Sequence, residues 1–133
     1  MKRRQKYNAR RTTLQGITFD SKKEAQRYIY LRELEQQGII NNLHRQVTYT
    51  LLPAITQTTT QQLKTKTRTT TRTIQRAITY RADFVYCKDG RIVTEDVKAS
   101  PKMIPADFKL KQKLFFARHR YHISLIFHPE QPP

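Results

Sequence analysis

The chain has 133 residues, enough for one compact domain with a modest core and too few for two ordinary domains. Its 26 Lys and Arg against 10 Asp and Glu give a net charge of +16, which predicts a polyanionic partner. The basic residues are spread along the whole sequence rather than along one amphipathic helix, which favours nucleic acid over an anionic membrane. A lone cysteine excludes an internal disulfide, and no apolar stretch approaches the roughly 20 residues of a membrane span, so we expect a cytoplasmic protein.

The first part of the chain predicts a basic arm followed by a helix. Residues 1–14 are rich in Lys and Arg with few apolar partners, so we expect a flexible arm there and a single domain over residues 15–133. A first helix is predicted from Ser21 to Gln37, because Ser21 and Glu24 fit a capping box and Gly38 supplies a left-handed stop.

The rest of the chain predicts strands around one further helix. β-Branched and aromatic residues favour strands over residues 43–52, 77–86 and 91–98, and the last two flank a Lys88-Asp89-Gly90 turn typical of a hairpin. A second helix should run from Pro105 to about Arg118, followed by a strand over residues 122–128. The expected apolar residues of this second helix are Phe108, Leu110, Leu114, Phe115 and Ala117. The order α-β-β-β-α-β predicts an α/β (α+β) fold with a central mixed sheet.

Between residues 56 and 73 lies a threonine-rich basic insertion. Its threonines favour an extended backbone, and Lys64, Lys66 and Arg68 would then project to one side of a strand. Composition leaves two interpretations open, a basic ribbon or loop that contacts phosphates and a solvated, poorly ordered insertion.

Counting across the predicted hairpin brings two carboxylates together. If Asp89 and Gly90 form a two-residue turn, Lys88 pairs with Arg91, and the same register places Asp83 opposite Asp96. Opposed like charges destabilise a sheet unless a cation lies between them, so the pattern favours a divalent metal site.

A lysine joins the two acids. Side chains alternate along a strand, so Lys98 should lie on the same face as Asp96, where its ammonium could orient water or stabilise charge on a phosphate. The structural alternatives are a surface salt bridge between Asp96 and Lys98 and a purely capping role for Glu24.

The segments that carry this pattern also support a resemblance. The runs GITFDSKKEAQRYIYLRELEQQGII, YRADFVY, VTEDVKA and FKLKQKLF are similar to those of small phage-encoded proteins assigned to the PD-(D/E)XK nuclease superfamily, DUF1064-like and Holliday-junction-resolvase-like. The resemblance covers most of residues 16–127. It implies a restriction-endonuclease-like α-β-β-β-α-β core and a metal-dependent endonuclease that hydrolyses DNA.

The resemblance also implies roles for individual residues. Catalysis would fall to Glu24, Asp83, Asp96 and Lys98, with Mg²⁺ or Mn²⁺ bound by Asp83, Asp96, the Val97 carbonyl and Glu24. The expected DNA contacts are Gln46, Lys64, Lys66, Arg68, Lys109 and Lys113.

The implied substrate is branched DNA or a recombination or replication intermediate in the cytoplasm of a phage host. A homodimer would allow symmetric cleavage of two strands. Two rival interpretations remain open. One is a non-catalytic DNA-binding protein whose acidic cluster is structural, and the other is an RNA-binding protein with the ribbon lying along RNA.

Overall fold

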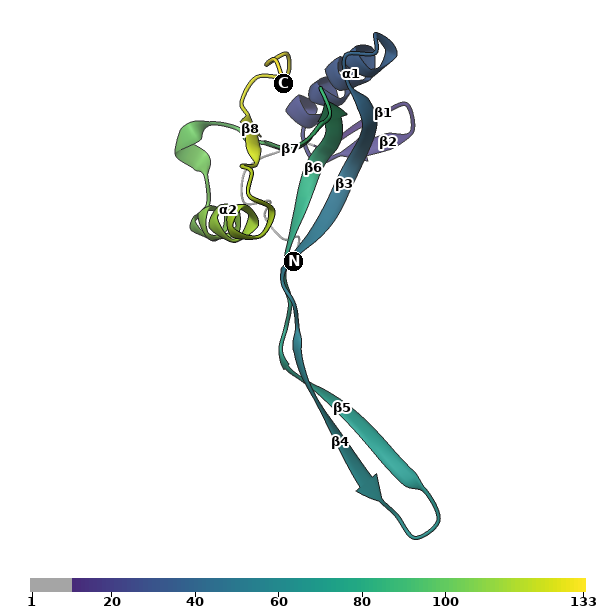
Figure 1. Ribbon diagram of the computed structural model, residues 1–133. Coiled ribbons are helices and arrows are strands. Elements are labelled where there is room, and N and C mark those ends of the chain that lie inside the picture. The colour runs from purple at the N-terminus through teal and green to yellow at the C-terminus, as the bar shows by residue number, and fades with distance from the viewer. Residues whose placement is uncertain (1–10) are drawn as a thin grey trace, which may run out of the picture.

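The computed structural model describes residues 11–133. Its elements, in chain order, are β1 (Thr12–Leu14), β2 (Ile17–Phe19), α1 (Lys22–Gln36), β3 (Asn41–Leu52), β4 (Ile55–Gln62), β5 (Thr67–Gln75), β6 (Ile78–Lys88), β7 (Arg91–Val97), the 3₁₀ helix η1 (Pro101–Met103), α2 (Ala106–His119) and β8 (Ser124–Ile126). The predicted α-β-β-β-α-β series is present, with the small β1–β2 hairpin before it and the β4–β5 hairpin inserted between β3 and β6 (Figure 1).

A four-stranded sheet forms the centre of the domain, in the order β3-β6-β7-β8. β6 is antiparallel to both of its neighbours, whereas β8 runs parallel to β7. The α2 helix supplies the connection that a parallel pair requires. The protein is therefore a mixed α+β domain with a central mixed sheet, as its sequence predicts.

The first helix begins and ends as the capping residues predict. Ser21 Oγ accepts a hydrogen bond from the Glu24 backbone N–H at 3.1 Å, and Gly38 has a φ of +75° just beyond the helix. Only half of the predicted capping box is used, because the Glu24 carboxylate accepts a hydrogen bond from Gln46 instead. The Glu24 carboxylate therefore contacts Gln46 on β3 rather than the end of its own helix.

The β6–β7 hairpin has the predicted two-residue turn. Asp89 and Gly90 have φ values of +51° and +75°, which matches the turn type that Asp-Gly favours. Lys88 pairs with Arg91, and the same register continues to the pair Phe84↔Glu95. The register argument therefore holds as far as Phe84, the residue that follows Asp83 in the sequence.

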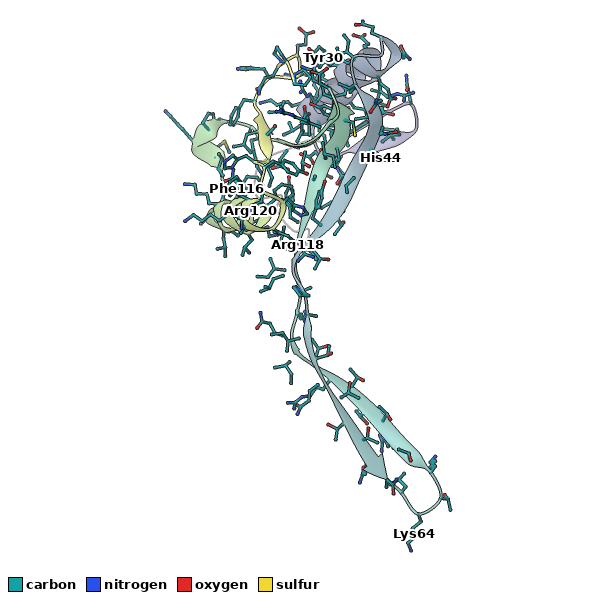
Figure 2. The ribbon with its side chains drawn as sticks, viewed as in Figure 1. Tyr30, His44, Lys64, Phe116, Arg118 and Arg120 are labelled. Carbon is teal, nitrogen blue, oxygen red and sulfur yellow. The ribbon has the colours of Figure 1, made fainter. Side chains whose placement is uncertain are left out.

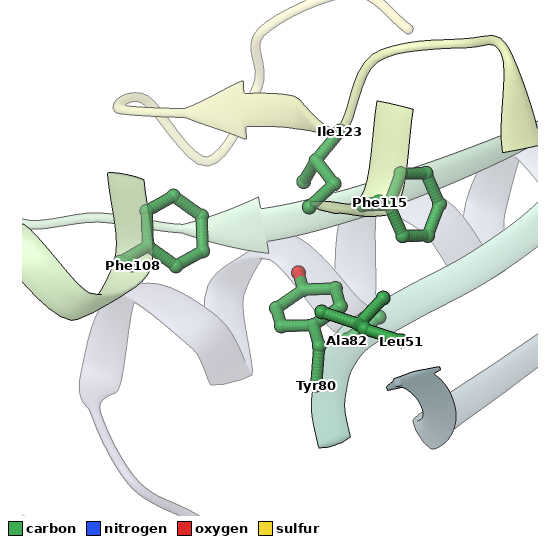
Figure 3. Close-up of a cluster of buried hydrophobic side chains, with 6 residues drawn as sticks. All are labelled: Leu51, Tyr80, Ala82, Phe108, Phe115 and Ile123. Atoms are coloured by element: carbon green, nitrogen blue, oxygen red, sulfur yellow. The ribbon is translucent and has the colours of Figure 1, made fainter. Parts of the chain in front are cut away.

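Two apolar clusters pack against different parts of the sheet. The cluster between α1 and the sheet consists of Leu31, Leu34, Ile40, Phe84 and Tyr86. The cluster between α2 and the sheet, shown in Figure 3, consists of Leu51, Tyr80, Ala82, Phe108, Phe115 and Ile123. On β6, the buried members of the two clusters lie on either side of Asp83 in the sequence. Leu110 is 56% exposed, contrary to its expected place among the apolar residues of α2, because it lies about 200° around the helix from Phe108.

The beginning of the described chain corrects one boundary. Thr12–Leu14, expected within the flexible arm, pairs with Ile17–Phe19 and contacts α1. A φ of +76° at Gly16 permits the tight connection between the two strands. The remainder of the expected arm, residues 1–10, lies outside the described residues, and its flexibility stays a prediction.

The threonine-rich insertion forms a ribbon rather than an irregular loop. β4 and β5 pair in antiparallel register and extend away from the domain as a two-stranded continuation of β3 and β6 (Figure 1). Lys64 and Lys66 lie in the connection between the two strands and only Arg68 lies on β5, so these residues do not share one strand face as expected. Within residues 11–133, no helix is long and apolar enough to cross a membrane.

Candidate functional site

The β6–β7 ladder ends where the candidate site begins. Beyond Phe84↔Glu95, the Asp83 side chain replaces a backbone partner, and its Oδ2 accepts a hydrogen bond from Val97 N–H at 2.8 Å. Asp83 thus reaches the end of β7 through its carboxylate rather than as a directly paired strand residue. This arrangement brings Asp83 beside Asp96, although by a different route from the regular pairing that the sequence predicts.

Gln46 connects the neighbouring strand to the acids. It has a φ of +51°, a left-handed conformation that a non-glycine residue adopts at a cost in conformational energy. Its Nε2 lies 2.9 Å from Glu24 Oε1 and 3.4 Å from Asp83 Oδ1, and it donates to both. The strained backbone therefore supports a side chain that bridges α1 and β6.

Lys98 and Asp96 form an ion pair, with 2.6 Å between Lys98 Nζ and Asp96 Oδ2. The lysine side chain is only 18% exposed, and Nζ also lies 3.8 Å from the centroid of the Phe108 ring on α2. Apart from this ammonium, the buried Asp96 Oδ2 has no hydrogen-bond partner within the described part of the chain. The pair is thus well shielded, unlike the exposed salt bridge considered as an alternative.

Burial and neighbouring negative charges disfavour ionisation of Asp83 and Glu24, raising the pKa of each. Burial, followed by the charges of Asp96 and Glu24, raises the pKa of Asp83 to about 8, against the opposing effect of the Val97 hydrogen bond. Burial and the Asp20 charge raise the pKa of Glu24. A cation bound between the carboxylates would lower the electrostatic cost of ionising them.

Two cavities open onto these side chains. One of about 610 Å³ is lined by Asp20, Ser21, Lys22, Lys23, Glu24, Asp83, Asp96, Val97, Lys98, Ala99, Met103 and Pro105. A second of about 350 Å³ is lined by Asp20, Gln46, Tyr80, Arg81, Asp83, Asp96, Lys98, Pro105, Asp107, Phe108 and Lys111. Asp83, Asp96 and Lys98 line both cavities, whereas Glu24 lines only the larger one. A single ligand could therefore contact Asp83, Asp96 and Lys98 from either side.

Of the three lysines on the second helix, only Lys111 lines a cavity at the acidic site. Lys111 lines the smaller cavity, whereas Lys109 and Lys113 are exposed and line neither. On a helix, Lys111 shares a face with Asp107 and Phe108, and Phe108 is buried against the sheet. The position of Phe108 in the apolar pattern is the signal that would have selected Lys111.

Lys23 is a further contributor that the sequence did not reveal. Its Nζ donates to the carbonyl of Lys98 at 3.3 Å and to that of Ala99 at 3.0 Å, so it holds the segment that follows β7. No local motif marks this contact, since the partners are more than 70 residues apart in the sequence.

A buried ion pair between Arg27 and Glu95 was also missed. Arg27 Nε donates to Glu95 Oε2 at 2.9 Å, and Arg27 also donates to the carbonyls of Pro129 and Gln131. One signal was available, because Arg27 lies one helical turn before Leu31 on the apolar face of α1.

The donor set is suited to a hard divalent cation, although it is not assembled around one. Within residues 11–133, no group of three or more His, Cys, Asp or Glu side chains is arranged to hold a metal ion. Asp83 and Asp96 nevertheless supply carboxylate oxygens beside each other, and within the described residues Asp96 Oδ2 has no partner other than the Lys98 ammonium. Oxygen-only ligands of this kind fit Mg²⁺ or Mn²⁺ better than zinc or copper.

Comparison with known proteins identifies a family whose function is not assigned. The sequence profile of the family described as "Protein of unknown function (DUF1064)" matches residues 4–128. The chain belongs to the DUF1064 family. No curated protein and no solved structure matches the chain. The matched range of the DUF1064 profile includes the acids, Gln46, Lys98 and the whole β4–β5 ribbon.

The expected DNA-contacting residues of this DUF1064 protein fall into separate regions. Gln46 lies within the acidic site, Lys109 and Lys113 lie on the exposed surface of α2, and Lys64, Lys66 and Arg68 lie on the ribbon. Figure 2 shows Lys64 at the far end of the ribbon, well away from the domain. These residues do not form one continuous site, and their contacts with DNA stay predictions.

Proposed function

We propose that this protein is a metal-dependent endonuclease that hydrolyses DNA phosphodiester bonds. The observation that carries the proposal is the convergence of Asp83, Asp96 and Lys98 at the point where β6 and β7 separate. The chain's net charge of +16 supports a nucleic-acid substrate. The resemblance to phage-encoded PD-(D/E)XK nucleases, with their restriction-endonuclease-like core, supports the same reaction.

Asp83 and Asp96 would hold Mg²⁺ or Mn²⁺, joined by Glu24 and the Val97 carbonyl. The N–H and C=O of one strand residue point to the same side, so the Val97 N–H bonded to Asp83 supports a carbonyl directed toward the same edge. A bound divalent cation supplies Lewis acidity and lowers the pKa of water. It would also offset the repulsion among the carboxylates, which fits the raised pKa of Asp83 and Glu24.

The remaining side chains would orient substrate and water. The Lys98 ammonium, fixed between Asp96 and the Phe108 ring, is positioned to stabilise negative charge that develops on a phosphate. Gln46 holds Glu24 and Asp83 in their relative orientation. Lys111 and Arg81, which line the smaller cavity, would bind phosphates next to the cleaved bond.

The proposed substrate is branched DNA or another recombination or replication intermediate, and a homodimer would cut its two strands symmetrically. Most of the affinity would come from contacts between Lys or Arg and phosphates, so it should fall as the salt concentration rises.

A cleavage assay tests the proposal. Plasmid, branched DNA and RNA are incubated with the wild type, Lys98→Ala and Lys88→Ala, each with Mg²⁺ or with EDTA. Lys88, near the distant hairpin turn, serves as a matched control. We expect Mg²⁺-dependent cleavage of DNA by the wild type and Lys88→Ala, and a loss of about 100-fold or more in Lys98→Ala. DNA binding without cleavage, or a preference for RNA, would favour a non-catalytic DNA- or RNA-binding protein instead.

A further inference from the structure

Within residues 11–133, no other element packs against the β4–β5 ribbon. Residues 52–77 are all exposed, and a two-stranded hairpin without an apolar face is marginally stable in water. Residues 36–82 contain no Asp or Glu, so the whole ribbon is positively charged. Its basic residues are Lys64, Lys66, Arg68, Arg72 and Arg76. An unpartnered element with this charge is complementary to a polyanion.

The pairing of β4 with β5 gives the ribbon two chemically different faces. On one face the cross-strand pairs are Gln57↔Arg72, Thr59↔Thr70 and Gln61↔Arg68. On the other they are Thr56↔Thr73, Thr58↔Thr71, Thr60↔Thr69 and Gln62↔Thr67. The hydroxyls of Thr58 and Thr71 lie 3.3 Å apart, as expected for side chains on one face. We call these the Arg–Gln face and the threonine face.

The Arg–Gln face carries the side chains that recognise base edges. Arginine can bond to both O6 and N7 of guanine, and glutamine to N6 and N7 of adenine, whereas threonine makes less discriminating contacts. The two Arg–Gln pairs are four residues apart along each strand, about 13 Å, which corresponds to roughly four base pairs. A surface that bound phosphates alone would not require two glutamines opposite the two arginines.

The ribbon's dimensions select the groove. The major groove of B-DNA is about 12 Å wide and accommodates a two-stranded β-ribbon, whereas the major groove of an RNA helix is deep and too narrow for one. Eight residues of β4 span about 26 Å, close to the rise of eight base pairs.

We propose that the β4–β5 ribbon enters the major groove of duplex DNA with its Arg–Gln face against the base edges, while the tip lysines contact the phosphate backbone. The proposal takes its DNA partner from the proposed function, but it does not depend on catalysis. The ribbon would then bind a duplex arm of the DNA outside the acidic site. It would also prefer particular bases within that arm.

Binding to a duplex with a filled major groove tests the proposal. Fluorescence anisotropy in EDTA, at constant ionic strength, compares a DNA duplex with the same duplex carrying glucosylated 5-hydroxymethylcytosine. This modification fills the major groove and leaves the number of phosphate charges unchanged. The wild type should bind the filled duplex about tenfold more weakly, since each two-bond contact with a base contributes on the order of tenfold.

Two charge-matched variants locate the effect. Arg68→Thr/Arg72→Thr removes two charges from the Arg–Gln face, and Lys64→Thr/Lys66→Thr removes two charges from the tip. Threonine is the replacement in both variants because it favours strands. Both should bind ordinary duplex DNA more weakly than the wild type. Only the first should lose the difference between the two duplexes.

The possible outcomes separate the ribbon's role from catalysis. Equal binding of both duplexes by the wild type, a preference for duplex RNA, or loss of discrimination in the lysine variant would overturn the proposal. Discrimination retained in the arginine variant would overturn it as well. Because EDTA prevents metal-dependent cleavage, a protein that fails the nuclease assay can still pass this one, and the reverse also holds.

Discussion

Arg27 of α1 and Glu95 of β7 form an ion pair in which both side chains are fully buried. The Tyr86 hydroxyl also donates to Glu95. Glu24 precedes Arg27 by about one helical turn, and Asp96 directly follows Glu95 on the opposite side of β7. The pair therefore fixes α1 against β7 on one side, while Glu24 and Asp96 face the candidate site.

Breaking this pair should destabilise the fold. Arg27→Met leaves the Glu95 charge buried without a cation, and we expect a loss of about 3–5 kcal/mol in the free energy of unfolding. Arg27→Met/Glu95→Leu removes both charges and should recover much of that loss. Urea denaturation of the wild type, the single variant and the double variant measures this. A double variant no more stable than Arg27→Met would contradict the expectation.

The raised pKa of Asp83 predicts a pH-dependent stability. The ordinary value for the unfolded chain is 3.8 and the folded value is about 8, so the folded state retains a proton that the unfolded state has already released. Stability in EDTA should therefore fall as pH rises from about 4 to about 8 and then level off. In Asp83→Asn, the free energy of unfolding should vary less with pH over this range. Its advantage over the wild type should be largest at pH 9, where Asp83 of the wild type is ionised, as measured by urea unfolding. An unchanged slope would contradict the assignment.

Gln46 allows the strained backbone to be separated from the side-chain contacts. Gln46→Gly relieves the left-handed conformation at φ +51° and should be about 1 kcal/mol more stable than Gln46→Ala. Both variants lose the donor to Glu24 and Asp83, so both should reduce DNA cleavage to a similar extent. Unfolding and cleavage measured on the same preparations provide the test. A large difference between their cleavage rates would assign the effect to the backbone instead.

The ribbon should be dispensable for folding. Deleting residues 55–75 leaves Pro53, Ala54, Arg76 and Ala77 as a four-residue connection between β3 and β6. Because the deleted residues are exposed and belong to neither apolar cluster of the described chain, the free energy of unfolding should change by less than about 1 kcal/mol. Thermal unfolding of the shortened chain measures this. A loss of several kcal/mol would show that the ribbon supports the domain.

Local signals in the sequence predicted much of the fold. The Ser21 cap, the Gly38 stop and the Asp89-Gly90 turn each act within a few residues, and the structure has all three. The turn also fixed the register that leads toward Asp83 and Asp96. The β1 strand was not predicted, since residues 1–14 were expected to form a flexible arm. The final strand was expected over residues 122–128 but covers only Ser124–Ile126, because its bounds depend on pairing with the distant strand β7.

Long-range contacts account for what the sequence left out. Nothing local marks Gln46 as left-handed or Lys23 as the partner of the Lys98 carbonyl. Each position is set by how two distant elements pack, and a single sequence contains no measure of that packing. Alternation along β7 did place Asp96 and Lys98 on one side, because that periodicity belongs to the strand itself.

Binding of a divalent cation is the most direct test of the acidic site. Mn²⁺ is titrated by calorimetry into the wild type, Asp96→Asn and the control Asp89→Asn, whose substitution in an exposed turn retains a residue suited to positive φ. We predict saturable binding by the wild type and the control, and an affinity about tenfold or more lower in Asp96→Asn. Equal affinities in all three proteins, or no binding by the wild type, would contradict a metal site at Asp83 and Asp96.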